Sequence, residues 1–535
     1  MGVNKQMTAE EAVARIKDGD CITVSGTGGQ MLPTKVLNAL EVRFLTDGHP
    51  RDLTWFDPFP TGIAGIEPVS HEGLVKRMIG GYYKPHPSLG SLINENKVEA
   101  YMFPLGTLGF WCQQMAAGRK GLLTQVGLET YLDPRHGGGK LNSAATEDLV
   151  SLVSLDGEEY LWYKTVPITA ALIRATTADE DGNLSLEEET LTMSVFYQAM
   201  AAKRFGGVVI AQVKRVVKNG QINPRMVVVP GLLVDCVVVD PGQHRNESAP
   251  DRDWLDQDKW RPRPPEAVLL STGPQVWRAW LEDGAVNAPP HGDYYPLTAD
   301  KLSARRAALE LKRGEVVNLG AGQPLRDICP VALEEEMEGE VELTGQAGVV
   351  GGIFNGGTGF RSNTRYYFDT PGIFSFYNAG LITTTYLGML DFDRQGNVNN
   401  MKYGDTWVGP GGSMDIAHAA KKIVFLGTFS AGGLKIETGT GRMAIVQEGS
   451  ASRLVDKVSW VCFNGPKMFR EGKEVLYITE RAVFKLSAQG PVLTEVAPGV
   501  DIERDIIGRM GFRPLIAPDL RLMDERIFRN QAMGI

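Results

Sequence analysis

Several features that define other classes of protein are scarce or missing in this sequence of 535 residues. Cysteine occurs only five times and never as a Cys-x-x-Cys pair, which argues against a disulfide framework or a zinc knuckle and fits a reducing cytoplasm. The seven histidines show no metal-binding spacing, and no Gly-x-Ser-x-Gly motif of serine hydrolases is present. No run of about eighteen apolar residues occurs. We therefore expect no bound metal, no serine-hydrolase chemistry and no membrane span.

An excess of positive charge is also missing. The 55 basic residues are outnumbered by 64 acidic ones, and the net charge of −9 excludes the electrostatic footprint of a general nucleic-acid-binding protein. Glycine, in contrast, is abundant, with 62 residues that follow no three-residue period. This usage indicates many tight turns or close approaches of the backbone to a ligand. The length predicts two or three domains.

The N-terminal residues predict an α/β unit. Thr8 and Glu11 have the spacing of a helix capping box, and residues 21–24 form a short β-prone run. The glycine loop at 26–29 follows this run, and Pro33 is well placed for the first turn of the next helix. A strand, a glycine loop and a helix in this order are typical of α/β proteins.

The same order of features recurs about half a chain later. Residues 311–323 repeat the pattern that begins at residues 16–20, and Gln395-Gly396-Asn397 repeats Asp181-Gly182-Asn183. Each of these turns is followed by an Ala-Ala-Lys triplet and a Val/Ile-rich strand pattern. The sequence therefore predicts two related open α/β domains that arose by internal duplication.

The two predicted domains are separated by a segment of different composition. Residues 241–296 are rich in Pro, Asp, Arg and Trp and show little periodicity, which is typical of a surface linker. We therefore expect an N-terminal domain at 1–240 and a C-terminal domain at 297–535. Because ligand sites of α/β proteins lie near the carboxyl ends of strands and often between domains, we expect an active site at the interface of the two halves.

Single motifs leave their function open. The loop at 26–29 lacks a dinucleotide fingerprint because Met31 stands where a glycine is required, so it is either an anion-binding loop or a turn shaped for packing. Asp133 precedes a proline and is most simply a turn residue. Taken alone, Glu129 has the character of a surface acid and Gln346 that of a loop residue.

The combination of motifs is more specific than any one of them. In order along the chain it comprises NKVEAYMFPLG from Asn96, GLLTQVGLETYLDPRHGGGKLN from Gly121, RATTADEDGN from Arg174, VVVPGLLVDCVVVDP from Val227, GPGGSMDIA from Gly409, IVQEG from Ile445, YITERAVF from Tyr477, VAPGVDIERDI from Val496 and LMDERIF from Leu522. Together these stretches resemble the class I CoA-transferase family, in particular its long single-chain acetate/propionate type with two fused halves. The resemblance also explains the internal duplication.

The resemblance implies a substrate and a site. Coenzyme A enters as a substrate rather than as a tightly bound cofactor, and the partners are an acyl-CoA and a small carboxylate in a cytoplasmic homo-oligomer. In this family a glutamate attacks the acyl-CoA carbonyl, and an acyl-glutamyl anhydride and a glutamyl-CoA thioester follow in turn. The resemblance assigns substrate binding to Gly26, Gly28, Gly29, Leu105, Gly351, Gly352, Gly409, Gly411 and Gly412.

This sequence departs from the family at three of the matched positions. Gln346 stands where the motif has its nucleophilic glutamate, Leu105 replaces the glutamine of Pro-Gln-Gly, and Glu129 replaces the second glycine of Gly-Leu-Gly-Thr. A neutral amide is a very poor nucleophile, so Gln346 and Glu129 are the candidate catalytic positions whose chemistry is open. Three hypotheses follow: a CoA-transferase or an inactivated form of one, a CoA-thioester or C–C hydrolase with Glu129 as general base, and a non-catalytic acyl-CoA-binding protein.

Overall fold

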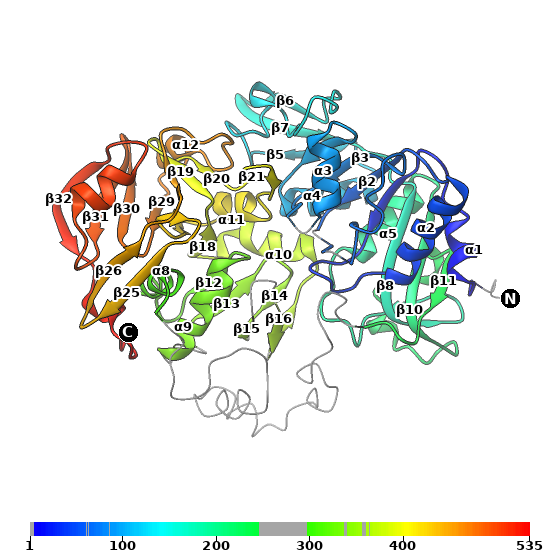
Figure 1. The fold of residues 1–535 in the computed structure, drawn as a ribbon. Coiled ribbons are helices and arrows are strands. Elements are labelled where there is room, and N and C mark those ends of the chain that lie inside the picture. The colour runs from blue at the N-terminus through cyan, green and yellow to red at the C-terminus, as the bar shows by residue number, and fades with distance from the viewer. Residues whose placement is uncertain are drawn as a thin grey trace, which may run out of the picture. The chain divides into compact units, whose positions relative to one another are not determined.

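The computed structural model describes residues 5–244 and 297–535, except positions 60, 63, 85, 336, 338, 339, 352, 356–359 and 363. The described residues form two compact units (Figure 1). The first contains the residues up to 244 together with 367–374 and 401–415, and the second contains the others from 297 onward. Residues 245–296 of the expected linker lie outside the described residues, so the boundaries at 240 and 297 stay a prediction.

The first unit is built on a parallel sheet in the order β11-β10-β8-β1-β2-β3-β4. Its strands are β1 (Cys21–Val24), β2 (Leu53–Asp57), β3 (Val75–Gly80), β4 (Glu99–Met102), β8 (Ala170–Asp179), β10 (Val208–Val217) and β11 (Cys236–Val239). A short strand, β9 (Leu184–Ser185), pairs with β8, and a separate antiparallel sheet contains β5 (Gly121–Thr124), β7 (Glu158–Lys164) and β6 (Val150–Leu155). The central strand β8 is buried along its whole length, as expected for a parallel sheet that is covered on both faces.

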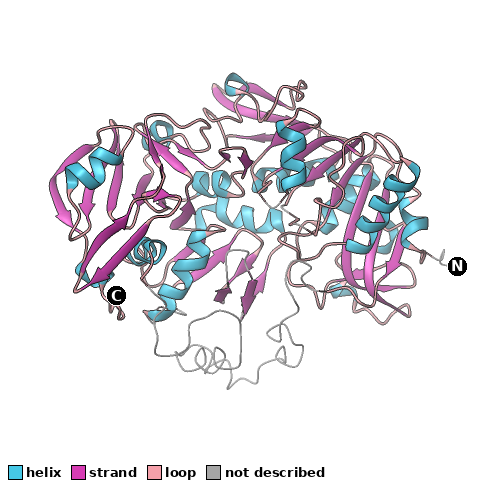
Figure 2. Ribbon diagram, viewed as in Figure 1, coloured by secondary structure: helices cyan, strands magenta, loops and turns pink. Residues whose placement is uncertain are grey.

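Helices alternate with these strands (Figure 2). They are α1 (Ala9–Val13), α2 (Thr34–Asp47), α3 (Pro87–Asn94), α4 (Leu105–Ala116) and α5 (Val195–Arg204). The predicted capping box is confirmed, because the Glu11 amide donates to the Thr8 hydroxyl at 3.2 Å and the Thr8 amide donates to the Glu11 carboxylate at 2.9 Å. The strand predicted at 21–24 is β1. Among the described residues, no helix combines the length and the apolar character needed to cross a bilayer.

The second unit contains a larger sheet with strands in the order β14-β13-β12-β18-β23-β29-β30-β31-β32. These strands are β12 (Val316–Leu319), β13 (Glu342–Gly345), β14 (Val349–Val350), β18 (Thr384–Gly388), β23 (Lys422–Leu426), β29 (Glu474–Ile478), β30 (Ala482–Ser487), β31 (Gly490–Val496) and β32 (Leu515–Leu522). Helices α8 (Ala299–Ala308), α9 (Cys329–Glu334) and α12 (Gly465–Arg470) belong to this unit.

The other described α-helices and strands are short. They are α10 (Thr370–Phe376), α11 (Ser413–Ala419), β15 (Ile353–Asn355), β16 (Phe360–Ser362), β17 (Tyr366–Tyr367), β19 (Asp391–Asp393), β20 (Val398–Asn399), β21 (Lys402–Tyr403), β22 (Thr406–Trp407), β24 (Ser430–Ala431), β25 (Lys435–Gly439), β26 (Arg442–Gln447), β27 (Ala451–Ser452) and β28 (Leu454–Val455).

Five neighbouring strands have the same order and direction in the two units. The series β11-β10-β8-β1-β2 of the first sheet corresponds to β29-β23-β18-β12-β13 of the second, and all neighbours within both series run parallel. The repeated sequence patterns at 16–20 and 311–323 lead into or include the equivalent strands β1 and β12. The prediction of two related α/β domains is therefore confirmed.

The repeated Gly-Asn turn of the first unit is held by a set of partly buried hydrogen bonds, here called the Asp-Asn lock. Asp179 ends β8, and its Oδ1 atom accepts hydrogen bonds from the amides of Asp181 at 3.1 Å and Asn183 at 2.9 Å. The Asn183 side chain donates to the other Asp179 oxygen at 2.8 Å and accepts from the Gly231 amide at 2.8 Å. The asparagine thus ties the turn to a segment almost fifty residues further along the chain.

The second unit repeats this lock. Asp393 Oδ1 accepts from the amides of Gln395 at 2.9 Å and Asn397 at 3.0 Å. The Asn397 side chain donates to Asp393 Oδ2 at 3.1 Å and accepts from the Gly465 amide at 3.0 Å. The Gly-Asn pair that recurs in the sequence therefore marks the same pattern of hydrogen bonds in both units.

We expect Asn183→Ala and Asn397→Ala each to lower the free energy of unfolding by about 1–3 kcal/mol, because each leaves a buried glycine amide without its acceptor. Urea unfolding followed by circular dichroism measures the change. Asn223→Ala, at an exposed cap of a three-residue turn, is the matched control and should cost less than about 1 kcal/mol. Equal losses in all three variants would contradict a special role for the lock.

Candidate functional site

The residues that the sequence assigns to substrate binding in the first unit gather at one edge of its sheet. Because the main strands are parallel, their carboxyl ends meet at that edge, where ligands of α/β proteins commonly bind. The loop at 26–29 follows β1 directly, and Leu105 follows β4 after two residues. Between them, β2 ends at Asp57 and β3 ends at Gly80. The edge from β1 to β4 is therefore the candidate site.

The glycine loop after β1 is closed by its own backbone. Thr27 and Gln30 exchange two hydrogen bonds, with N···O distances of 3.0 and 2.9 Å, and the Gly29 amide donates to the Thr61 carbonyl at 3.1 Å. Gly26 has a φ angle of 110°, and a β-carbon there would lie 2.5 Å from the carbonyl oxygen of Gln30. Packing alone therefore requires glycine at position 26.

One amide of this loop stays available to a ligand. Within the described part of the chain, the Gly28 N–H has no protein acceptor, whereas the amides on both sides of it are used in the loop. Gly28 also has a left-handed φ angle of 55°. The anion-binding reading of the loop therefore rests on Gly28, while Gly26 and Gly29 shape the turn around it.

A segment from the second half of the sequence covers this edge. The Val408 carbonyl accepts from the Tyr83 amide at 2.7 Å, just beyond β3. Gly411 then pairs with both neighbouring strand ends: its amide donates to the Gly81 carbonyl at 3.2 Å, and its carbonyl accepts from the Leu105 amide at 2.9 Å. The segment at 401–415 thus belongs to the first unit and brings the second-half glycine motif to the candidate site.

Gly409 is required by the closeness of this contact. Its φ angle is 111°, and a β-carbon there would lie 2.8 Å from both the Gly81 carbonyl oxygen and the Met102 sulfur. Gly412 continues the same turn before α11. Leu105 is buried, and its side chain packs where a β-carbon of Gly81 would otherwise stand. At this edge the position that is glutamine in the family therefore presents an apolar side chain.

Sequence reasoning missed Asp415, which fastens the segment to helix α4. Its carboxylate accepts from the Gly106 amide at 2.9 Å and from the Thr107 hydroxyl at 2.7 Å, and the residue is only 2% exposed. Burial raises the pKa of Asp415 to about 7, although the hydrogen bonds from Thr107 and Gly106 oppose this shift. The residue stands inside the GPGGSMDIA stretch, so an acid next to a glycine motif was the available clue.

Glu129 lies in a tight turn that is attached to the end of β4. The Tyr131 hydroxyl donates to the Met102 carbonyl at 3.1 Å, and Asp133 accepts from the Glu129 amide at 3.1 Å. This confirms Asp133 as a turn residue. Glu129 is partly exposed and has a φ angle of 60°, a left-handed conformation that glycine adopts most easily. The glycine that the family has at this position therefore fits the backbone, and the glutamate is an exception.

Gln346 lies in the second unit, in the turn between β13 and β14. Its side chain is partly exposed, and the turn is closed by a hydrogen bond from the Gly348 amide to the Gly345 carbonyl at 3.2 Å. Gly351 has a φ angle of 73°, and its amide donates to the Leu343 carbonyl at 2.8 Å. Gly352 lies outside the described residues. The expectation that Gln346 and the first unit share one site stays a prediction.

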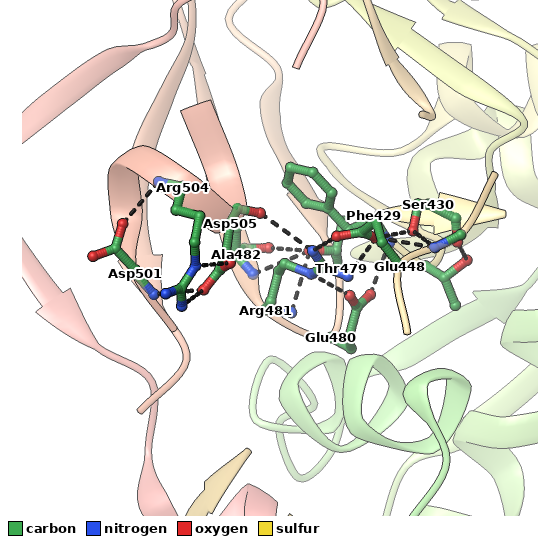
Figure 3. A network of polar contacts seen from close by, with 12 residues as sticks. Phe429, Ser430, Glu448, Thr479, Glu480, Arg481, Ala482, Asp501, Arg504 and Asp505 are labelled. Carbon is green, nitrogen blue, oxygen red and sulfur yellow. Dashed lines mark hydrogen bonds and ion pairs between the residues drawn. The ribbon is translucent and has the colours of Figure 1, made fainter. Parts of the chain in front are cut away.

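A buried ionic network, also missed by the sequence analysis, lies at the carboxyl end of β29 in the second unit (Figure 3). Arg481 is fully buried between two carboxylates, with 2.6 Å from its Nε atom to Glu480 and 2.7 Å from Nη1 to Glu448. Its guanidinium stacks 4.7 Å from the centre of the Phe429 ring, and the Phe429 amide donates to Glu480 at 2.7 Å. The network connects loops 429–430, 448–449 and 479–482, so the YITERAVF stretch has a structural role.

Comparisons with known proteins point to one family. The family model described as "Coenzyme A transferase" matches residues 6–240. The chain is 38% identical to acetate CoA-transferase YdiF of Escherichia coli K12 over 99% of this chain and 96% of that protein. It is 35% identical to caffeate CoA-transferase of Acetobacterium woodii over 99% of this chain and 98% of that protein.

A solved structure shows the same similarity in three dimensions. The acyl-CoA transferase YdiF of Escherichia coli O157:H7, described as a thioester complex with CoA, superposes with a TM-score of 0.88 at 36% identity. The match covers 99% of this chain and 97% of that one. The fold and the near full-length relatives define an enzyme of the acyl-CoA-using class. The chain belongs to the coenzyme A transferase family, which confirms the resemblance found in the sequence.

The raised pKa of Asp415 predicts a pH effect on stability. The ordinary aspartate value is 3.8 and the folded value is about 7, so the folded protein holds an extra proton between these pH values. The contribution of Asp415 to the free energy of unfolding is therefore fully present below about pH 4, and it is lost as the pH rises through about 7. We expect Asp415→Asn, which cannot ionise, to flatten this loss of stability in thermal unfolding scans from pH 4 to 8.

Removing the Asp415 side chain tests its hydrogen bonds to helix α4. We expect Asp415→Ala to destabilise the protein by about 1–3 kcal/mol at every pH, because it leaves the Gly106 amide and the Thr107 hydroxyl unpaired. Asp405→Asn changes an exposed acid of the same segment and is the control for the loss of charge. A pH profile of Asp415→Asn that matches the profiles of wild type and this control would refute the assignment.

Proposed function

We propose that this enzyme moves CoA between an acyl-CoA and a small carboxylate. The observation that carries the proposal is the convergence, at the carboxyl edge of the first sheet, of the loops at 26–29, 105–107 and 408–412, which the family resemblance assigns to substrate binding. The names of two full-length relatives, an acetate and a caffeate CoA-transferase, support the same reaction class. The Gly28 N–H, which has no protein acceptor among the described residues, can stabilise a thioester oxyanion.

Gln346 determines which route this transfer takes. A glutamine amide cannot form the enzyme-bound anhydride that a glutamate forms, so we propose a direct transfer within a ternary complex. An oxygen of the acceptor carboxylate attacks the acyl carbonyl carbon, the C–S bond breaks, and CoA leaves as the thiolate. The thiolate then attacks the other carbonyl of the mixed anhydride, and the original acyl group departs as a carboxylate. Both steps gain from holding the reactants in place, which is a large source of rate enhancement.

A hydrolase is the second candidate, and one observation favours it. Glu129 belongs to a turn that is attached to the carboxyl end of β4, at the same edge as the candidate site. A carboxylate at this edge can serve as a general base for water. In that case water replaces the acceptor carboxylate, and the products are a free acid and CoA.

The kinetic order tests the transfer route. With acetyl-CoA and labelled propionate, we expect wild type to give intersecting double-reciprocal plots and no borohydride-sensitive enzyme adduct. Gln346→Glu should give parallel plots, a CoA adduct sensitive to borohydride or hydroxylamine, and exchange at least about tenfold faster, because the carboxylate restores the covalent route. Gln489→Glu adds the same charge at an exposed turn of the same unit and should have no effect. If wild type shows no exchange across a panel of short carboxylates, the transferase proposal fails, and if Gln346→Glu yields no adduct, the role assigned to position 346 fails.

The fate of acyl-CoA without an acceptor separates the two candidates. We expect wild type to hydrolyse acetyl-CoA much more slowly than it exchanges CoA, and Glu129→Gln to leave exchange nearly unchanged. Should hydrolysis be the principal reaction, Glu129→Gln must lower it by roughly a hundredfold while CoA affinity is preserved. Thiol release assayed with a chromogenic disulfide and calorimetry with CoA measure the two quantities.

The proposal has two further parts that come from the family resemblance. We retain a homo-oligomeric state and a cytoplasmic location as predictions for this enzyme.

A further inference from the structure

Two buried side chains at the candidate site have polar atoms without a hydrogen-bond partner among the described residues, although the Asp57 carboxylate accepts one hydrogen bond from the Phe59 backbone. Asp57 ends β2 and is 3% exposed, and His86 precedes the first turn of α3 and is 1% exposed. Within the described residues, neither Oδ1 of Asp57 nor either ring nitrogen of His86 forms a hydrogen bond. Because unpaired polar groups are costly to bury, such atoms indicate a polar occupant.

Asp57 ends β2, and the loop that contains His86 follows the neighbouring strand β3. Asp57 is paired in register with Gly80 of β3, and a β-carbon on Gly80 would lie 2.8 Å from the Tyr83 ring. The Tyr83 ring therefore stands beside Asp57 where a side chain of β3 would otherwise be. The Tyr83 carbonyl accepts from the His86 amide at 2.9 Å, so a single turn connects the tyrosine to the histidine.

Asp57 and helix α3 lie on the same face of the sheet. Phe56 contacts Trp111 of α4, with ring centres 5.3 Å apart, so Asp57, the next residue, points to the opposite face. The connections β1-α2-β2 and β3-α3-β4 advance in the same direction along the sheet. Since such parallel crossovers are right-handed, α2 and α3 share one face, away from α4. His86 at the start of α3 thus faces the layer that contains Asp57.

The pair is flanked by the two loops of the candidate site. Thr61, four residues after Asp57, accepts from Gly29 of the first glycine loop, and Tyr83 donates to Val408 of the second at 2.7 Å. Burial raises the pKa of Asp57 well above its ordinary value and lowers the pKa of His86 to about 3. Burial thus favours the uncharged form of both groups, which suits a neutral polar ligand better than an ion.

We propose that Asp57 and His86 form a subsite that hydrogen-bonds a hydroxyl group on the acyl chain, so that the enzyme prefers hydroxyacyl-CoA to unsubstituted acyl-CoA. A neutral imidazole offers one donor and one acceptor, and a hydroxyl group can both donate and accept. The inference rests on the proposed function, because it takes acyl-CoA as the substrate. A site built for a hydroxyl group discriminates strongly against an analogue that lacks it.

The test compares butyryl-CoA with 2-, 3- and 4-hydroxybutyryl-CoA, by calorimetry for Kd and by kcat/KM with acetate as acceptor. We expect wild type to prefer at least one hydroxylated thioester by about tenfold or more. Asp57→Leu and His86→Leu should bring this ratio near one while the Kd for butyryl-CoA changes less than about twofold. Asp57→Asn keeps hydrogen-bonding atoms and should retain part of the preference.

Folding and ligand effects are separated by the controls. We expect Asp57→Leu to lower the Tm of the free enzyme, because the Phe59 amide loses its acceptor, and His86→Leu, which replaces an unpaired buried imidazole, to leave the Tm unchanged or higher. Tyr386→Phe removes another unpaired buried hydroxyl, in the second unit, and should leave the ratio unchanged.

The possible outcomes distinguish the subsite from the reaction. Equal affinity of wild type for all four thioesters means that the pair holds only buried water, and this overturns the inference, as does a preference that survives in Asp57→Leu/His86→Leu. A binding preference without CoA transfer supports the subsite and overturns the proposed reaction. Absence of any CoA binding overturns both.

Discussion

The contact on which the candidate site depends is the attachment of residues 401–415 to the carboxyl edge of the first sheet. A parallel sheet leaves carbonyl and amide groups at its strand ends, and these must be paired or hydrated. Here Val408 and Gly411 pair with backbone groups of the segments that follow β3 and β4, and Asp415 binds the first turn of α4. Glycine at 409 permits the approach. Without this segment, Leu105 and the loop after β3 would lose the backbone partners that fix their positions.

The two units share a parallel five-strand core and a turn with the same hydrogen bonds. Each unit has five parallel strands in the same order, and each also holds one tight turn between antiparallel strands with an aspartate and an asparagine. The two units differ in the strands and segments that are added to the common five strands. The second unit extends its sheet with antiparallel strands and encloses the Arg481 network, whereas the first receives the 401–415 segment. Specialisation of a duplicated fold thus took place at strand ends, where loops tolerate change.

The three departures from the family have different physical consequences. Glu129 places a side chain on a left-handed backbone position, Leu105 places an apolar group against Gly81, and Gln346 removes a charge from a hairpin turn. Only the last alters the available covalent chemistry, since an amide cannot carry an acyl group as a carboxylate does. The direct route and the Asp57–His86 subsite are compatible, because one concerns the reacting carbonyl and the other the acyl chain.

The sequence by itself determined the α/β class, the duplication, the strand at 21–24, the capping box at Thr8 and the family, because propensity, glycine spacing and repeats are local or collinear properties. It did not show that Gly409 and Gly411 attach to the first unit, nor that Asp415, Asp57 and His86 are buried at its edge. These facts depend on contacts between residues up to about three hundred positions apart, such as that of Asp415 with Gly106. Whether an acid or a histidine is a surface group or a buried one is decided only when distant strands bring their ends together, since burial and lost hydration are properties of the assembled fold.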